Sequence, residues 1–163
     1  MAVRAFRNVA AIAVSAVLGG TGRTLLVQLL LSPPAFPIPL RGEGFTAILS
    51  AVLFMTGLIG FLPFGALAAV IATPPWRLRA ALLGAAAGWA CGLADTLYIW
   101  RHSGCTTLAA QGKVYPDASW ILSTPQAADL AGLLAGALLG ALIVQRIAVR
   151  RQQRLRPEPV PEP

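Results

Sequence analysis

Four long apolar stretches divide the chain, and short polar or proline-rich segments separate them. They cover residues 8–31, 45–72, 79–100 and 125–149. Each is long enough to supply the roughly 20 residues that a helix needs to cross the hydrocarbon core of a bilayer. Because no water satisfies backbone groups there, such runs predict helices. The pattern therefore predicts an all-α fold, a polytopic four-helix transmembrane bundle formed by residues 1–149.

The first stretch also has features of a secretory signal peptide. Arg4 and Arg7 precede a run of apolar and small residues, 9–18, as in such peptides. No clean cleavage site of small residues follows this run, and a second apolar run, 25–31, extends the segment to spanning length. We therefore expect a retained helix. The alternative is cleavage, which would leave three spans.

Composition favours a membrane protein over a soluble one. Of the 163 residues, 56% are apolar and 12% are charged, and the mean hydropathy is +0.70. An ordinary soluble domain carries about 25% charged residues. The net charge of +7 would suggest a nucleic-acid partner in a soluble protein, so the placement of the basic residues decides between the two interpretations.

The basic residues fall mostly on one side of the expected membrane. If the N-terminus is inside, only Arg41, Arg101 and Lys113 lie outside. Cytoplasmic loops carry an excess of Lys and Arg, so we expect a bacterial-type inner-membrane protein with both termini in the cytoplasm. The inside set is Arg4, Arg7, Arg77, Arg79, Arg146, Arg150, Arg151, Arg154 and Arg156.

The segment after the last stretch, residues 150–163, is basic at first and then rich in proline and glutamate. This composition predicts a disordered cytoplasmic tail. Because the basic stretch 146–156 directly follows a span, we expect it to contact anionic lipid headgroups rather than nucleic acid.

The last two apolar stretches carry small residues at four-residue spacing, in a pattern typical of a glycine zipper. Such GxxxG repeats let helix backbones approach closely in a membrane. Because the two helices are consecutive, we expect them to pack on each other through these stripes; the alternative is pairing between chains. The stripes are Ala80, Gly84, Gly88 and Gly92 in the third stretch, and Ala128, Gly132, Gly136 and Gly140 in the fourth.

Three ionisable residues lie inside the spans: Arg23, Asp95 and Asp129. A charge in hydrocarbon costs on the order of 3 kcal/mol, so such residues usually face protein or water. At about 100° per residue, each falls on the small-residue face of its own helix. At about 1.5 Å per residue, both acids lie roughly 6–8 Å below the outer surface, and Arg23 roughly 12 Å below it. The sequence predicts a cluster of one cation and two carboxylates.

Three interpretations of this cluster are open. It is an ion pair that fixes the register of the helices, or a carboxylate relay for protons or ions. In the third interpretation, Asp95 and Asp129 share a proton and supply both the acid and the base of an aspartic peptidase.

The peptidase interpretation rests on a resemblance to a family. The chain has Gly92-Leu93-Ala94-Asp95-Thr96 near the end of the third stretch and Pro125-Gln126-Ala127-Ala128-Asp129 at the start of the fourth. With the four-helix topology, these runs resemble the lipoprotein signal peptidase family, which has Asn-x-x-Asp-Arg and Phe-Asn-x-Ala-Asp at these places. The two aspartates and Ala128 match, whereas the asparagines, the arginine and the phenylalanine do not. The resemblance implies that Asp95 and Asp129 are a catalytic pair.

Other candidate chemistry is sparse. His102 is the one histidine, and Cys91 and Cys105 belong to no metal-ligand pattern, so we expect no metal and no cofactor. From abundant packing faces and few polar groups, we expect a non-catalytic accessory or assembly subunit of a membrane complex. The alternatives are a divergent lipoprotein-signal-peptidase-like enzyme and a small transporter or ion-relay protein.

Overall fold

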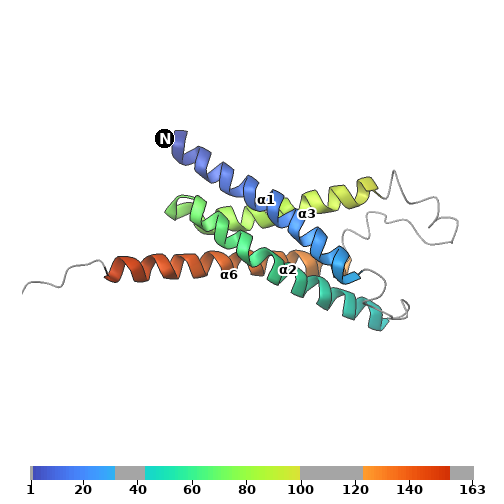
Figure 1. Ribbon diagram of the computed structural model, residues 1–163. Helices are drawn as coiled ribbons and strands as arrows, with labels where there is room; N and C mark the ends of the chain where they lie inside the picture. The colour runs from blue at the N-terminus through green and yellow to red at the C-terminus, as the bar shows by residue number, and fades with distance from the viewer. Residues whose placement is uncertain (1, 32–42, 100–122, 155–163) are drawn as a thin grey trace, which may run out of the picture.

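The computed structural model describes residues 2–31, 43–99 and 123–154, and all of its regular structure there is helical (Figure 1). Successive long helices run in opposite directions, so α1 is parallel to α3 and α2 is parallel to α6. The first residue of α1 and the last of α6 lie at the same end of the bundle. The elements are α1 (Ala2–Leu31), α2 (Glu43–Ile71), the short 3-10 helix η1 (Pro74–Trp76), α3 (Arg77–Ile99) and α6 (Thr124–Arg154).

The helices cover the four apolar stretches, with differences at their ends. α1 begins at Ala2, six residues before the expected start, so Arg4 and Arg7 are helical as well. α6 continues to Arg154, so the first, basic part of the expected tail extends the last helix as well. Residues 155–163 lie outside the described part of the chain.

Three helical segments in the described residues are long and apolar enough to cross a membrane: Ala2–Arg23, Thr46–Ile71 and Thr124–Arg154. The chain therefore has the helices of a multi-pass membrane protein. The fourth expected span, 79–100, corresponds to α3, which begins with two arginines.

The stripe of small residues on α6 packs against α2. Each stripe glycine lies against a backbone carbonyl oxygen of α2, at a spacing of four residues on both helices. Such contacts bring a glycine Cα next to a carbonyl, a geometry that recurs at close helix interfaces. The pairs are Gly132 with Phe54, Gly136 with Leu58, and Gly140 with Leu62.

α2 contributes two glycines of its own to this interface. A Cβ on Gly65 would lie 2.5 Å from the Cα of Ala137, and one on Gly57 would lie 2.9 Å from the backbone nitrogen of Leu133. Both distances are shorter than real Cβ contacts, so a side chain at either position would push the two helices apart. The α2–α6 interface is thus closely packed from both sides.

The stripe on α3 packs against α1. A Cβ on Gly84 would lie 2.8 Å from the Cβ of Ser15, and one on Gly88 would lie 3.1 Å from the carbonyl oxygen of Ala16. The Ser15 hydroxyl is buried and donates a hydrogen bond to the carbonyl of Phe64 on α2, at 3.3 Å. These contacts bind the α1–α3 pair to α2.

The expectation that the two stripes face each other is therefore wrong. Each stripe packs on a helix that is parallel to it and two helices earlier in the chain. The physical reason is that a row of glycines needs an opposing helix whose backbone carbonyls are not covered by side chains, and α2 has Gly57 and Gly65 at this interface. Phe54, Leu58 and Leu62 on α2 present such a row to α6.

Phe61 fills the space between the two parallel pairs. Its side chain is fully buried, and its ring lies against Gly19 of α1 and within 3.3 Å of a Cβ placed on Gly88 of α3. Phe64 meets this ring edge-on, with centroids 6.1 Å apart. An aromatic side chain of α2 therefore occupies the hollow that glycines leave in both neighbours.

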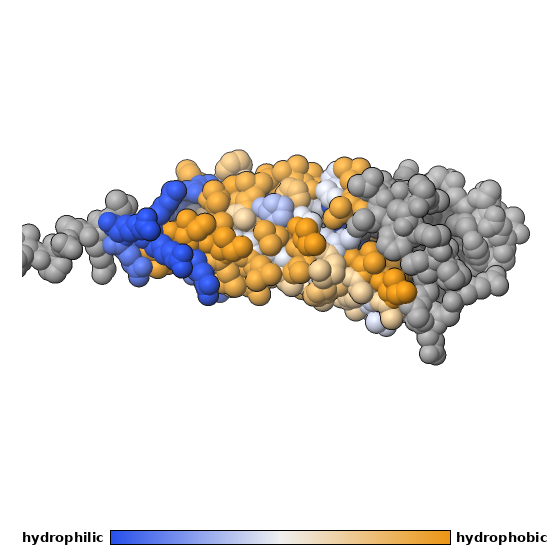
Figure 2. Space-filling model, turned by 60° about the horizontal axis from the view of Figure 1, so that its bottom comes forward, coloured by the Kyte–Doolittle hydropathy of each residue, from blue (hydrophilic) through white to orange (hydrophobic). Residues whose placement is uncertain are grey.

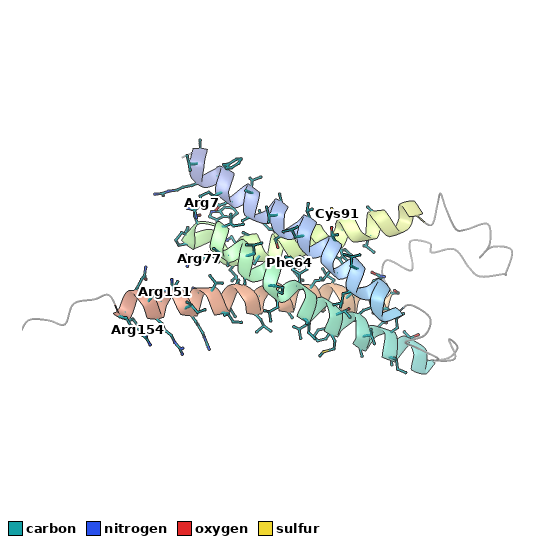
Figure 3. The ribbon with its side chains drawn as sticks, viewed as in Figure 1. Arg7, Phe64, Arg77, Cys91, Arg151 and Arg154 are labelled. Carbon is teal, nitrogen blue, oxygen red and sulfur yellow. The ribbon has the colours of Figure 1, made fainter. Side chains whose placement is uncertain are left out.

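Basic side chains gather at the end of the bundle where α1 begins and α6 ends (Figures 2 and 3). Figure 2 shows this hydrophilic end beside a long apolar surface, and Figure 3 shows Arg7, Arg77, Arg151 and Arg154 at the same end. Nε of Arg7 donates to the carbonyl of Ile71 at 3.1 Å, which satisfies an acceptor at the last turn of α2. These basic side chains thus lie at one end of an apolar body.

Candidate functional site

An ion pair between Arg23 of α1 and Asp129 of α6 lies inside the bundle, towards the end opposite the basic cluster. Nε of Arg23 donates to Oδ1 of Asp129 at 3.0 Å, and Nη2 donates to Oδ2. The Asp129 side chain is 0% exposed and that of Arg23 is 12% exposed. Two parallel bonds of this kind fix both the direction and the distance between a guanidinium and a carboxylate.

α1 places Arg23 on its inner face because of where its buried residues lie. Ser15 and Gly19 are buried at four-residue intervals, and Arg23 comes at the next interval. Residues four apart share a helix face, so the same face that packs on α3 and α2 carries the arginine inward. The inward orientation predicted for Arg23 and Asp129 agrees with the structure.

Glycines on the other two helices make room for the pair. A Cβ on Gly92 of α3 would lie 3.4 Å from Nη1 of Arg23. A Cβ on Gly57 of α2 would lie 3.1 Å from the carbonyl oxygen of Asp129. One residue from each of the four long helices therefore meets at this level, and the ion pair spans the bundle between them.

The ion pair joins the two long helices that lie farthest apart. α2 packs against α1, α3 and α6, and α3 packs against α1 and α6, whereas α1 and α6 share no extensive interface among the described residues. The long side chain of Arg23 reaches across this gap. The pair thus supplies a direct polar connection that backbone packing does not.

The hydrogen bonds and burial of the Asp129 side chain suit a structural role. Both of its oxygens accept N–H groups from Arg23, and no part of the side chain reaches solvent. A carboxylate that acts as a general base needs an oxygen within hydrogen-bond reach of water or substrate. The cluster thus contains one of the predicted contacts, Arg23 with Asp129. Asp95 belongs to α3, but its side chain lies outside the described residues, so its contact with Asp129 stays a prediction.

Two further buried polar groups lie near the N-terminus of α6. The Gln126 side chain is 5% exposed, and its Oε1 has no hydrogen-bond partner within the described ranges. The hydroxyl of Ser123 is likewise buried without a partner there. Gln126 precedes Asp129 by one helical turn, so these groups lie between the ion pair and the end of the helix.

The remaining sequence candidates form no second site within the described residues. Cys91 is exposed on α3, and the described residues contain no group of three or more His, Cys, Asp or Glu side chains that could hold a metal ion. His102 and Cys105 lie outside the described residues, as do Arg41, Arg101 and Lys113.

Comparison with known proteins gives no family for the chain. It matches no protein-family model, no curated protein and no solved structure. The resemblance to the lipoprotein signal peptidases accordingly rests on the two aspartates, Ala128 and the expected four-helix topology alone.

Sequence reasoning missed three residues that shape the bundle around the site. Gly57 and Gly65 pack against the backbone of α6. Phe61 lies midway between them in the sequence, and its ring packs against α1 and α3. The only signal was the pattern of two glycines eight residues apart, about 80° from each other around a helix, with a bulky residue between them. Without a known partner helix, this pattern does not indicate what the glycines pack against.

Proposed function

We propose that the chain is a non-catalytic, multi-pass protein of a bacterial-type inner membrane that serves as an accessory or assembly subunit of a membrane complex. The observation that carries the proposal is the buried Arg23–Asp129 pair, in which the arginine takes both carboxylate oxygens. An acid engaged in this way stabilises the bundle. It is not positioned for hydrolysis or for the transfer of a proton.

The distribution of surface side chains supports the same proposal. Large apolar side chains are exposed along the outer faces of α1, α2 and α6, for example Val17, Ile59 and Ile143. Most of the described chain belongs to the helices themselves. A protein with this composition has surfaces for lipid and for other membrane helices, and little soluble structure for chemistry.

We propose α3 as the fourth span and the basic end of the bundle as the cytoplasmic end. Support comes from Arg7, Arg77 and Arg151, which lie at the end of the bundle where α1 begins and α6 ends. An excess of basic residues marks the cytoplasmic side of short loops. Green fluorescent protein fused after Arg154 should fluoresce, whereas alkaline phosphatase fused at the same position should be inactive. Alkaline phosphatase fused within residues 101–122 should be active.

The accessory role is tested by native mass spectrometry of the full chain, tagged at its C-terminus and expressed at its natural level. The expected result is a complex that contains a second polypeptide in fixed stoichiometry. Detection of the 17.0 kDa chain alone, or only as copies of itself, would overturn the proposal.

The two alternatives make different predictions for Asp129. In a peptidase that resembles the lipoprotein signal peptidases, Asp129→Asn and Asp95→Asn would each abolish cleavage of a lipoprotein precursor while the protein stays folded. In an ion relay, both changes would alter ion-dependent flux. Under the structural proposal, Asp129→Asn lowers stability, and precursor cleavage and ion flux remain those of the wild type.

A further inference from the structure

A groove follows one face of α6 at the basic end of the bundle. Its volume is about 440 Å³, and it is open to the outside of the bundle. Every residue that lines it is exposed. They are Leu142, Gln145, Arg146, Val149, Arg150 and Gln153, which recur at intervals of three and four and therefore form a single helix face.

The lining changes from apolar to basic along the helix. Leu142 lies at the end nearer the middle of the bundle, followed by Arg146 one turn on and Arg150 two turns on. α6 has no acidic residue after Asp129, so no carboxylate of this helix neutralises the two guanidinium groups. A planar guanidinium matches the geometry of a phosphate, and two of them one turn apart can hold its oxygens from two sides.

The groove lies at the level where the helices leave the apolar region. α6 and α2 are in a constant register, from Gly132 beside Phe54 to Gly140 beside Leu62. Continued along both helices, this register places Val149 at the level of Ile71, the last residue of α2. Trp76 follows in η1, with the Arg79 guanidinium 5.6 Å from its ring centroid, and tryptophan is typical of the headgroup region.

We propose that this groove binds one anionic phospholipid, with its phosphate held by Arg146 and Arg150 and an acyl chain along Leu142. Charge complementarity and the apolar-to-basic order along the helix select this ligand. A zwitterionic lipid offers the same phosphate but adds a cation beside two arginines. The proposal concerns a lipid site on the outer face of α6 and stands independently of the accessory role.

Two other arginines of the same helix, which do not line the groove, provide a charge-matched control. Arg151 and Arg154 carry the same charge within the same two turns, but neither lines the groove. Diffuse attraction to an anionic surface would depend on all four arginines about equally, because each contributes on the order of a five-fold gain in binding. Binding in the groove would depend on Arg146 and Arg150 alone.

The test uses the full chain in mild detergent, with phosphatidylglycerol titrated and bound lipid counted by native mass spectrometry. Arg146→Gln with Arg150→Gln should weaken the first binding event roughly 25-fold, whereas Arg151→Gln with Arg154→Gln should change it by less than about two-fold. All four residues are exposed and far from the core, so circular dichroism should show the same helix content in both variants.

Several outcomes would overturn the proposal. Equal losses in the two double variants would show a diffuse field instead of a groove. Equal affinity for phosphatidylcholine would show that the negative charge is not recognised, and displacement of the lipid by millimolar inorganic phosphate would show a site for free phosphate. In support, Leu142→Gln should weaken binding of long-chain phosphatidylglycerol but not of a short-chain analogue.

Discussion

Arg23 and Asp129 lie 106 positions apart in the sequence and hold each other by two hydrogen bonds across the interior of the bundle. Among the described residues, their helices α1 and α6 have little other contact, because α2 and α3 lie between them. The pair therefore adds a direct polar contact between two helices that are otherwise placed by their packing on α2 and α3. Removal of one partner has a different effect from removal of both.

Arg23→Leu should lower the free energy of unfolding by about 3 kcal/mol or more, because it leaves the Asp129 carboxylate buried without a counter-ion. The double variant Arg23→Leu with Asp129→Leu should recover most of that loss, since it buries no charge. Unfolding by sodium dodecyl sulfate, followed by circular dichroism, measures both. A double variant as unstable as the single one would show that the pair is not an isolated ionic contact.

Gly136→Val should destabilise the α2–α6 interface by about 1–3 kcal/mol, the usual cost of an overpacked site. The added side chain would meet the backbone carbonyl of Leu58, which cannot rotate away as a side chain can. Ala131→Val on the same helix is the matched control, because Ala131 is exposed. Equal behaviour of the two variants in the same unfolding assay would contradict the close packing of α6 on α2.

Gly19→Ala should destabilise the protein because the new methyl group overlaps the Phe61 ring. Phe61 is fully buried, and its ring also contacts the Gly88 position, so it has no open space to enter. In a Phe61→Leu background the same change should cost less, and the two effects should deviate from additivity by about 0.5 kcal/mol or more. Strict additivity would indicate that the ring and residue 19 are not in contact.

Asn8→Leu should loosen the connection between α1 and the turn that follows α2. Oδ1 of Asn8 accepts hydrogen bonds from both the backbone nitrogen and the hydroxyl of Thr73, each at 3.0 Å. Loss of the acceptor should cost about 1–3 kcal/mol, whereas Thr73→Val, which removes one bond, should cost about 1 kcal/mol. Hydrogen exchange at the Thr73 amide is the direct measurement, and unchanged protection in Asn8→Leu would contradict the assignment.

The hydropathy pattern was sufficient to predict four helices and their approximate bounds, because the length of an apolar run reports directly on a helix. It also predicted that Gly88 and Gly136 lie in close-packed faces, since small residues at four-residue spacing have few other uses in a membrane. The prediction that the stripes on α3 and α6 pack on each other was wrong. The choice of partner depends on which opposing helix presents a row of accessible carbonyls, such as those of Phe54 and Leu58, and residue spacing alone does not report this.

The candidate site was predicted in part for similar reasons. Helical geometry placed Arg23 and Asp129 on inner faces, and charge made them natural partners. The geometry left open whether Arg23 pairs with Asp95 or with Asp129, because both acids fall at the same depth. Gly57, which lies against the turn that carries Asp129, became informative only once its partner helix was known.

Because α6 is the last helix of the bundle to leave the ribosome, Arg23 enters the bilayer well before its counter-ion exists. At about 5–20 residues per second, the 106 positions between the two residues correspond to roughly 5–20 s of translation. During that interval the arginine must be sheltered by the insertion machinery or by the headgroup layer. Premature termination before residue 124 would release a three-helix intermediate in which Arg23 lacks Asp129.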